Sequence, residues 1–418
     1  MTARSKEQLA INGGPRVRTT PLPPRHLFGE EEKRAVDALF DKSIETGQAF
    51  SYNGPEEEAY CKQFSDFLGG GYADAVNSGT SAVYVALRAL EIEPFTEVIV
   101  PSVSDMGGVM PVPLMNCLPV PADCAPGTYN MGPQEVENAI TERTSAIVVA
   151  HIAGTPADIG PIMEMARAKN IKVVEDCAQA HGARYNGQYV GTFGDIAAFS
   201  TMSGKHHATA AQGGVVYTKS EALYWKARQC SDRGKPFGLE DAEGNVTCSL
   251  NLNLNDLSAV VGMVQLQKLP GMLERIRLVA EKVIDLCQPL QAVSVDQGPE
   301  GAEGAFWFMV FRLDLGKVSC DLDTFVEALN AEGLPFNAHY TTPFTHHAWY
   351  KNRAVFGNSG YPWTCPLYTG DPNRRFPLPN WTANNDSMFL IKVHEGMTLR
   401  EAEDIADALA KVEGAFLK

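Results

Sequence analysis

The sequence lacks an excess of basic charge and a long unbroken apolar run. Its 418 residues contain 35 Lys and Arg against 50 Asp and Glu, which gives a formal net charge of −15. A surface this acidic repels phosphate backbones and anionic lipids, so we expect neither a nucleic acid nor a membrane as a partner. The most apolar long stretch, residues 106–122, is interrupted by prolines and is too short to span a bilayer.

Paired cysteines and secretion signals are also missing. The nine cysteines are scattered without a C-x-x-C pair, and the first 30 residues contain several prolines but no continuous apolar segment. This pattern suits free thiols in a reducing compartment better than a disulfide framework or a zinc site. We therefore expect a cytoplasmic protein without a metal site.

What is present is the pattern of a layered α/β protein. Apolar residues make up 44% of the chain and charged residues 20%, which is typical of a globular protein, and the length suggests two or three domains. Short apolar runs that alternate with helical patterns predict a mostly parallel central sheet flanked by helices. The expected helices are 56–68, 79–90, 133–140, 161–168 and 221–230, and the expected strands are 97–100, 146–150, 172–174, 196–199 and 215–217.

The pattern changes after Leu269-Pro270, where we place a domain boundary. A helix over 258–269 precedes the boundary, and a second one over 272–293 follows it. Beyond these we expect a strand over 306–311, a helix over 322–331, an irregular segment over 335–379 and a final helix over 399–417. The predicted organisation is an N-terminal arm (1–30), a large α/β domain (31–269) and a small C-terminal α+β domain (270–418).

Polar residues follow several of the expected strands, and open α/β sheets bind ligands at these strand ends. Gly79 and Thr80 stand at a helix start, where they either bind an anion through backbone donors or belong to an ordinary helix cap. Asp176 leaves a strand together with Gln179 and His181. It either pairs with a cationic ring nitrogen or a metal, or it caps the next segment.

Two further segments carry chemistry or structure. Lys205 follows a strand within a loop of small residues, where a desolvated amine becomes nucleophilic, although a solvated loop lysine is the simpler reading. Asn251 belongs to a run of alternating Asn and Leu over 250–255. That run suits capping, an interface, or a ligand that is reached from a neighbouring subunit.

Taken together, these segments resemble the DegT/DnrJ/EryC1/StrS sugar aminotransferases, which are pyridoxal-phosphate enzymes of fold type I. The resemblance runs almost end to end, and the order and spacing of its motifs over more than 300 residues carry it. Its motifs are Leu9-Ala10-Ile11-Asn12-Gly13-Gly14-Pro15, Glu97-Val98-Ile99-Val100-Pro101-Ser102, residues 144–151, Gln265-Leu266, His339-Tyr340 and the C-terminal helix, besides the four segments above.

The resemblance implies a role for individual residues. Lys205 matches the lysine that holds pyridoxal 5'-phosphate as an internal aldimine, and Asp176 matches the carboxylate that faces the pyridinium nitrogen. Gln179 matches the residue beside the ring oxygen of the cofactor. The phosphate-binding positions match Gly79, Thr80 and Ser200, and Asn251 matches an asparagine that reaches the phosphate of the partner subunit, which implies a homodimer with shared active sites. His339 and Tyr340 match the loop on the acceptor side and are candidate substrate residues.

The activity that the resemblance implies is a transamination. An amino group passes from glutamate or glutamine to a keto group of a nucleotide-linked sugar or a cyclitol, through a pyridoxamine intermediate. The chain departs from the family pattern at three positions. Asp105 stands where an aromatic usually covers the cofactor ring, Gln212 replaces an acid, and Asn253 replaces an arginine.

Two other functions fit the same residues. One is a pyridoxamine-dependent sugar dehydratase of this family, in which histidine replaces the lysine. The presence of Lys205 argues against the dehydratase. A shift of the loop by one residue would, however, place the adjacent His206 at the position of the lysine. The other is a cofactor-binding protein without catalysis, for which the three departures are the evidence.

Overall fold

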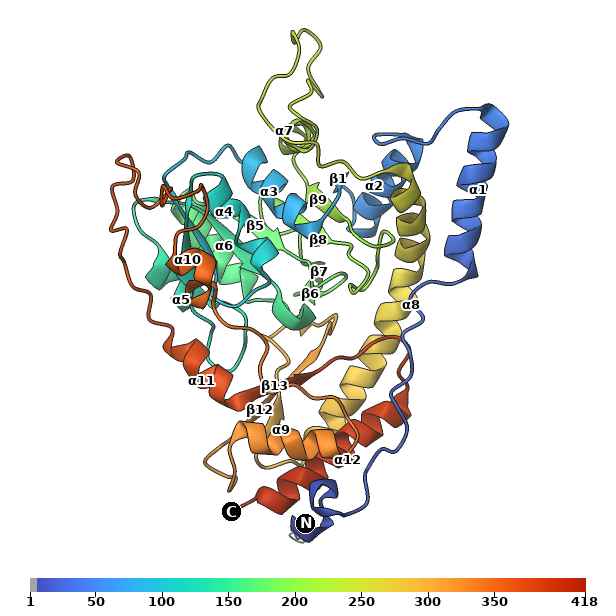
Figure 1. Cartoon of the computed structure of the whole chain (residues 1–418), viewed down its shortest axis with the longest axis vertical. Coiled ribbons are helices and arrows are strands. Elements are labelled where there is room, and N and C mark those ends of the chain that lie inside the picture. Colours follow the sequence, from blue (N-terminus) through green and yellow to red (C-terminus); the bar gives the residue numbers. More distant parts are fainter. Residues whose placement is uncertain (1–5) are drawn as a thin grey trace.

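The computed structural model describes residues 6–418 (Figure 1). The α-helices are α1 (Glu30–Thr46), α2 (Pro55–Phe67), α3 (Gly79–Ala89), α4 (Pro111–Leu114), α5 (Pro133–Ala139), α6 (Ile159–Ala168), α7 (Glu221–Ser231), α8 (Asp256–Cys287), α9 (Leu322–Ala331), α10 (Ala348–Lys351), α11 (Pro379–Ser387) and α12 (Leu399–Phe416). The strands are β1 (Tyr72–Val76), β2 (Glu97–Pro101), β3 (Leu118–Ala122), β4 (Thr144–Ala150), β5 (Lys172–Asp176), β6 (Arg184–Tyr185), β7 (Gln188–Tyr189), β8 (Ile196–Ser200), β9 (Gly214–Thr218), β10 (Val293–Val295), β11 (Ala302–Glu303), β12 (Met309–Leu313) and β13 (Met388–Ile391). Short 3-10 turns complete the elements: η1 (Lys6–Gln8), η2 (Ala10–Asn12), η3 (Met106–Gly108), η4 (Ile152–Gly154) and η5 (Phe344–His346).

The main sheet has seven strands in the order β1-β9-β8-β5-β4-β2-β3. Strand β9 runs antiparallel to both of its neighbours, whereas β8, β5, β4, β2 and β3 are parallel. Buried side chains of α3 and α7 pack on one face of the sheet, and those of α2, α5, α6 and the first half of α8 pack on the other. The predicted α/β class with a mostly parallel, helix-covered sheet is confirmed.

Helix α8 links the two parts of the molecule as a single rod (Figure 1). Leu266, Leu269 and Leu273 belong to the core of the large sheet, and Ile276 begins the contacts with the C-terminal core. The expected pair of separate helices is therefore wrong, because Pro270 lies inside the helix. Proline removes one backbone hydrogen bond there, but the side chains before and after it are buried in the two cores and keep the helix continuous.

The arm, large domain and small domain remain a prediction, and α8 crosses the proposed boundary at residue 269 without a break. The expected strand over 306–311 begins only at Met309. Phe306 has a φ of 50°, and the Trp307 amide donates to Ala153 O at 2.8 Å, so this segment pairs with the wall of the large domain before it enters the small sheet.

The N-terminal arm is attached to the C-terminal core. Leu9 is buried within that core. The buried carboxylate of Glu332 accepts hydrogen bonds from the amides of Ala10 and Val17 and pairs with Lys411 at 2.7 Å. The two ends of the described chain accordingly lie close together (Figure 1). Among residues 6–418, no helix combines the length and the apolarity that crossing a membrane requires.

Candidate active site

A pocket of about 250 Å³ opens at one edge of the main sheet. Its walls come from the segments that follow β1, β2, β4, β5 and β8, so the carboxyl ends of these strands converge there, as expected for an open α/β sheet. The predicted residues that the fold brings together in it are Gly79, Thr80, Asp176, Gln179, Ser200 and Lys205.

The floor of the pocket is the N-terminus of α3. Ser78 caps the helix by accepting a hydrogen bond from the Ser81 amide at 3.0 Å, so the earlier amides of Gly79 and Thr80 stay available for a ligand. A Cβ at Gly79 would lie 2.6 Å from the Ser200 Cβ, so the helix can approach the end of β8 only because residue 79 has no side chain. Amides, hydroxyls and the helix dipole together form a cradle for an anion.

Asp176 supplies the acid of the pocket. It is 8% exposed, and its Oδ1 accepts one hydrogen bond, from the Ala178 amide at 3.0 Å. Burial raises the pKa of this carboxyl group, while the Ala178 amide and the nearby Lys205 oppose the rise. A cationic ring nitrogen beside Asp176 would favour the ionised carboxylate still further.

Lys205 supplies the amine and is only 7% exposed. Burial lowers its pKa to about 8, with Asp176 and Asp105 acting against the change. Its Nζ lies 3.9 Å from the centre of the Trp307 ring. No motif of the sequence indicates this contact between Trp307 and Lys205.

The histidines that follow Lys205 point away from the pocket. His206 Nε2 bonds to Ala305 O at 3.0 Å, and His207 contacts Tyr60 and His181 at 2.8 and 2.9 Å. Burial lowers the pKa of both His206 and His207 to about 3, so they are neutral. The one-residue loop shift that would bring His206 to the place of Lys205 is therefore absent.

The two candidate substrate residues differ in position. The Tyr340 hydroxyl accepts a hydrogen bond from Gln179 Nε2 at 2.6 Å, which places it directly behind a pocket residue. Gln179 Oε1 in turn accepts from the Ala153 amide at 2.8 Å. His339 lies outside the pocket, is half exposed, and contacts Asn385 O at 3.1 Å and Asp323 at 3.4 Å.

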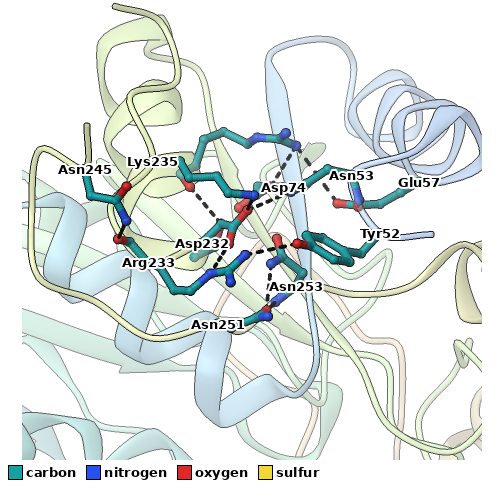
Figure 2. Close-up of polar contacts among 12 residues, drawn as sticks. Tyr52, Asn53, Glu57, Asp74, Asp232, Arg233, Lys235, Asn245, Asn251 and Asn253 are labelled. Atoms are coloured by element: carbon teal, nitrogen blue, oxygen red, sulfur yellow. Dashed lines mark hydrogen bonds and ion pairs between the residues drawn. The ribbon is translucent and has the colours of Figure 1, made fainter. Parts of the chain in front are cut away.

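Asn251 also lies outside the pocket of its own chain. Its run extends the edge of the sheet, where Val76 pairs with Asn253 and the Asn77 amide donates to Leu252 O at 2.7 Å. The Asn251 side chain accepts from Asn253 Nδ2 at 2.7 Å, beside a polar cluster of residues from α2, β1 and the end of α7 (Figure 2). The run thus borders the anion cradle on its outer side.

The turn that follows β2 forms one wall of the pocket. It carries Asp105, at the position where the family pattern has an aromatic residue. Asp105 is exposed, caps η3, and accepts from the Gly107 amide at 2.9 Å. A Cβ at Gly107 would lie 2.5 Å from Thr80 Oγ1, and one at Gly108 would lie 2.7 Å from Asp176 Oδ2. The backbone of Gly107 therefore lies against the anion cradle, and that of Gly108 lies against Asp176. The Met-Gly-Gly sequence after Asp105 is the feature of the sequence that could have indicated this close approach.

Comparisons with known proteins identify the family of the chain. Residues 29–371 match the model of the DegT/DnrJ/EryC1/StrS aminotransferase family. An aminotransferase from Psychrobacter cryohalolentis is 24% identical, with a TM-score of 0.80 over 94% of this chain and 98% of its own. S. venezuelae DesV in complex with a ketimine intermediate is 26% identical, with a TM-score of 0.76 over 94% of this chain and 99% of its own.

A third similar structure is a GDP-4-keto-6-deoxymannose-3-dehydratase with a trapped PLP-glutamate geminal diamine. It is 22% identical, with a TM-score of 0.77 over 94% of this chain and 100% of its own, a likeness that concerns the fold. The family match covers most of the chain and includes every segment that lines the pocket. The chain belongs to the DegT/DnrJ/EryC1/StrS aminotransferase family and is a pyridoxal-phosphate-dependent aminotransferase.

Proposed function

We propose that this enzyme transfers an amino group from glutamate or glutamine to a keto group of a nucleotide-linked sugar or a cyclitol. One observation carries the proposal: a buried amine, Lys205, and a buried acid, Asp176, line one pocket whose floor is an anion cradle. An amine for a carbonyl, an acid for a ring nitrogen and a cradle for a phosphate are the three groups that pyridoxal phosphate needs.

The types of residue in the pocket fit the chemical groups of the cofactor. Gly79, Thr80 and Ser200 would hold the phosphate, Asp176 would pair with the ring nitrogen, and Lys205 would hold the aldehyde carbon. Gln179 would lie beside the ring oxygen of the cofactor, and its hydrogen bonds with Ala153 and Tyr340 would hold it there. When bound, the cofactor supplies an electron-accepting ring that stabilises a carbanion.

The protein contributes proton transfer and the exclusion of water. Burial keeps the pKa of Lys205 near 8, so its Nζ can both accept and return a proton close to neutral pH. Tyr340 and the exposed His339 remain our candidates for contact with the acceptor, Tyr340 through its position behind Gln179. Asp105, at the open side of the pocket, would add a negative charge toward the substrate.

A homodimer is part of the proposal. An apolar groove beside the cradle is lined by Thr80, Tyr84, Leu114, Leu250 and Leu252, among others. Leu114 is 53% exposed and Leu250 is 59% exposed, and burying both would stabilise an interface. A second copy that covers this groove would bring Asn251 toward a neighbouring cradle, as the family resemblance implies.

The dehydratase is the second candidate, because a structure of that kind is similar in fold. The direction of His206 toward Ala305 O opposes it and favours transamination through Lys205. A cofactor-binding protein without catalysis is opposed by the presence of both Lys205 and Asp176 in the pocket. All nine cysteines are free thiols, which supports our proposal of a cytoplasmic protein.

The first experiment is the visible absorption spectrum of the protein loaded with pyridoxal phosphate, before and after glutamate or glutamine is added. We expect a band from the lysine-bound cofactor that fades with one of the donors. Lys205→Ala should abolish that band and reduce turnover by roughly 10²–10⁴-fold, because the proton-transferring amine is lost. A band that ignores both donors, or substantial turnover in Lys205→Ala, would contradict the proposal.

A further inference from the structure

The indole of Trp307 faces the amine of Lys205. The lysine Nζ lies 3.9 Å from the ring centre, and its side chain is almost fully buried. Tryptophan offers a cation the most favourable ring face among the aromatic side chains, and desolvation strengthens the attraction. Trp307 is not one of the residues that line the pocket, so the ring meets the lysine from outside it.

Trp307 is fixed from two directions. Its Nε1–H donates to Gly204 O at 2.9 Å, which ties the ring to the residue just before Lys205. Its backbone amide donates to Ala153 O at 2.8 Å, and the Ala153 amide donates to Gln179 in the pocket. Trp307 is thus attached both to the loop that carries the lysine and, through Ala153, to Gln179 in the pocket.

A second cation reaches the same ring. Lys392, directly after β13, has its Nζ 5.7 Å from the Trp307 ring centre and is exposed. Its charge disfavours a proton on Lys205 and contributes to the lowered pKa of that lysine, after burial, which is the main cause. The ring therefore favours the ammonium form of Lys205, and Lys392 opposes it.

We propose that Trp307 is a positioning residue whose indole face holds the Lys205 ammonium whenever this lysine is not bonded to the cofactor. The inference rests on the proposed function, in which Lys205 would hold the cofactor and would also transfer a proton. Held on the ring, Nζ keeps its proton beside the pocket instead of swinging into solvent. Lys392 limits the strength of this hold, because it adds a like charge at the same ring.

The test measures the protonation of Lys205 in the protein without cofactor. The rate at which it captures pyridoxal phosphate, followed by absorbance as a function of pH, reports the fraction of neutral amine. Ionisations of the cofactor are common to all variants, so differences between variants belong to the protein. Replacing Trp307 site-specifically by mono-, di- and tetrafluorotryptophan withdraws electrons from the ring face and nearly preserves its shape.

We expect the pKa of Lys205 to fall stepwise with each added fluorine, by about one unit across the series, because the ammonium loses its attraction to the ring. The same fluorinated residues at Trp225, a half-buried position on α7, should leave the pKa unchanged. Lys392→Gln should raise the pKa by about half a unit, whereas Lys169→Gln, at an exposed position after α6, should not.

A flat series at Trp307 in a protein that captures the cofactor normally would overturn this inference and leave the proposed function intact. A rise in pKa with fluorination would overturn it as well, because the ring would then be excluding water from Lys205 rather than attracting its charge. If the unsubstituted protein captures no pyridoxal phosphate, the proposed function fails first and this inference falls with it.

Discussion

Two consecutive carboxylates at the end of β5 are both buried, yet their surroundings are opposite. Glu175 accepts hydrogen bonds from His151 and from the amides of Gly191, Phe193 and Gly194, at 2.7 to 3.1 Å. Burial opposes its charge, but these bonds hold its pKa below the ordinary value. Asp176 accepts a single hydrogen bond, faces the pocket, and has a raised pKa.

The difference separates an acid that stabilises the fold from one that is left available to a ligand. His151 Nδ1 accepts from the Ala157 amide, so its Nε2–H donates to Glu175, and the oxygens of Glu175 are fully used. His151, Glu175 and Cys177 lie near enough to one another to suggest a metal site. The saturation of Glu175 assigns that group to structure instead. The Asp176 carboxylate accepts only one hydrogen bond, so it has room for a charged ring nitrogen as a further partner.

The largest expected effect is on chemistry at Asp176. Asp176→Asn keeps the shape of the side chain but removes the charge that would pair with the ring nitrogen. We expect turnover to fall by roughly 10²–10³-fold, because this is the loss seen when one group that stabilises charge is removed from an active site. The denaturant midpoint should change little. Steady-state kinetics and urea unfolding of the same preparation test this. Turnover near that of the unsubstituted protein would remove Asp176 from the proposed machinery.

Glu175→Gln is the matched variant and should show the reverse pattern. A glutamine places an NH₂ group among backbone donors and leaves at least one of them unpaired. Breaking such a buried charged network costs about 3 kcal/mol of unfolding free energy. Urea unfolding should show that loss, and the protein that remains folded should retain its cofactor band. If the two variants lose stability equally, the distinction between the two acids is wrong.

Lys205 extends the comparison to a base. Its pKa of about 8 in the fold lies below that of an unfolded lysine, so the unfolded chain binds more protons between about pH 8 and 10.4. Stability should rise across that window. Lys205→Met should therefore stabilise the cofactor-free protein at pH 7 by roughly 3 kcal/mol, and this advantage should vanish above pH ~10.5. Urea midpoints at the two pH values, with Lys169→Met as control, provide the measurement.

Glu57, in the polar cluster formed by α2, β1 and the end of α7, is a third buried group whose pKa is shifted (Figure 2). Burial, together with the nearby Asp74, raises its pKa to about 8, although Arg228 opposes the rise. The folded chain then binds more protons than the unfolded chain between about pH 4.5 and 8, so stability falls with rising pH. Glu57→Gln should therefore stabilise the protein at pH 8.5 and have no effect at pH 4.5, as measured by urea unfolding at the two pH values.

The control for that variant is Glu58→Gln, at the next, exposed position of α2. It should change the unfolding free energy equally at both pH values. If Glu57→Gln behaves in the same way as this control, Glu57 is ionised in the fold and Arg228 compensates its charge fully. The comparison of satisfied and unsatisfied acids would then apply to the pocket alone.

Much of the fold could be predicted from hydrophobic periodicity. The expected helices over 56–68 and 322–331 appear as α2 and α9 within one residue at each end. The sequence pattern does not predict strand β3, because Pro119 and Pro121 are unusual in a strand. Prolines are tolerated at the edge of a sheet, where β3 lies. Strand β1 was hidden by Asp74, a buried charge that its partner Arg228 makes possible.

The site could be predicted only where residue type and strand end coincide. Asp176 ends β5 and Lys205 lies in the loop after β8, so the topology that brings the ends of these strands together also brings the two residues together. Trp307 is far away in sequence, and its contact with Lys205 depends on the turn at Phe306, which no periodicity reveals. The outward direction of His206 likewise follows from a tertiary hydrogen bond, to Ala305 O.

The attachment of the arm to the C-terminal core has a consequence for synthesis on the ribosome. Leu9 and the amides of Ala10 and Val17 are translated early, but their partners include Glu332 and Lys411, which follow more than 300 residues later. This segment must therefore stay unpaired while the residues up to Glu332 are translated. Helix α12, which carries Lys411, is translated later still and completes the binding site of the segment.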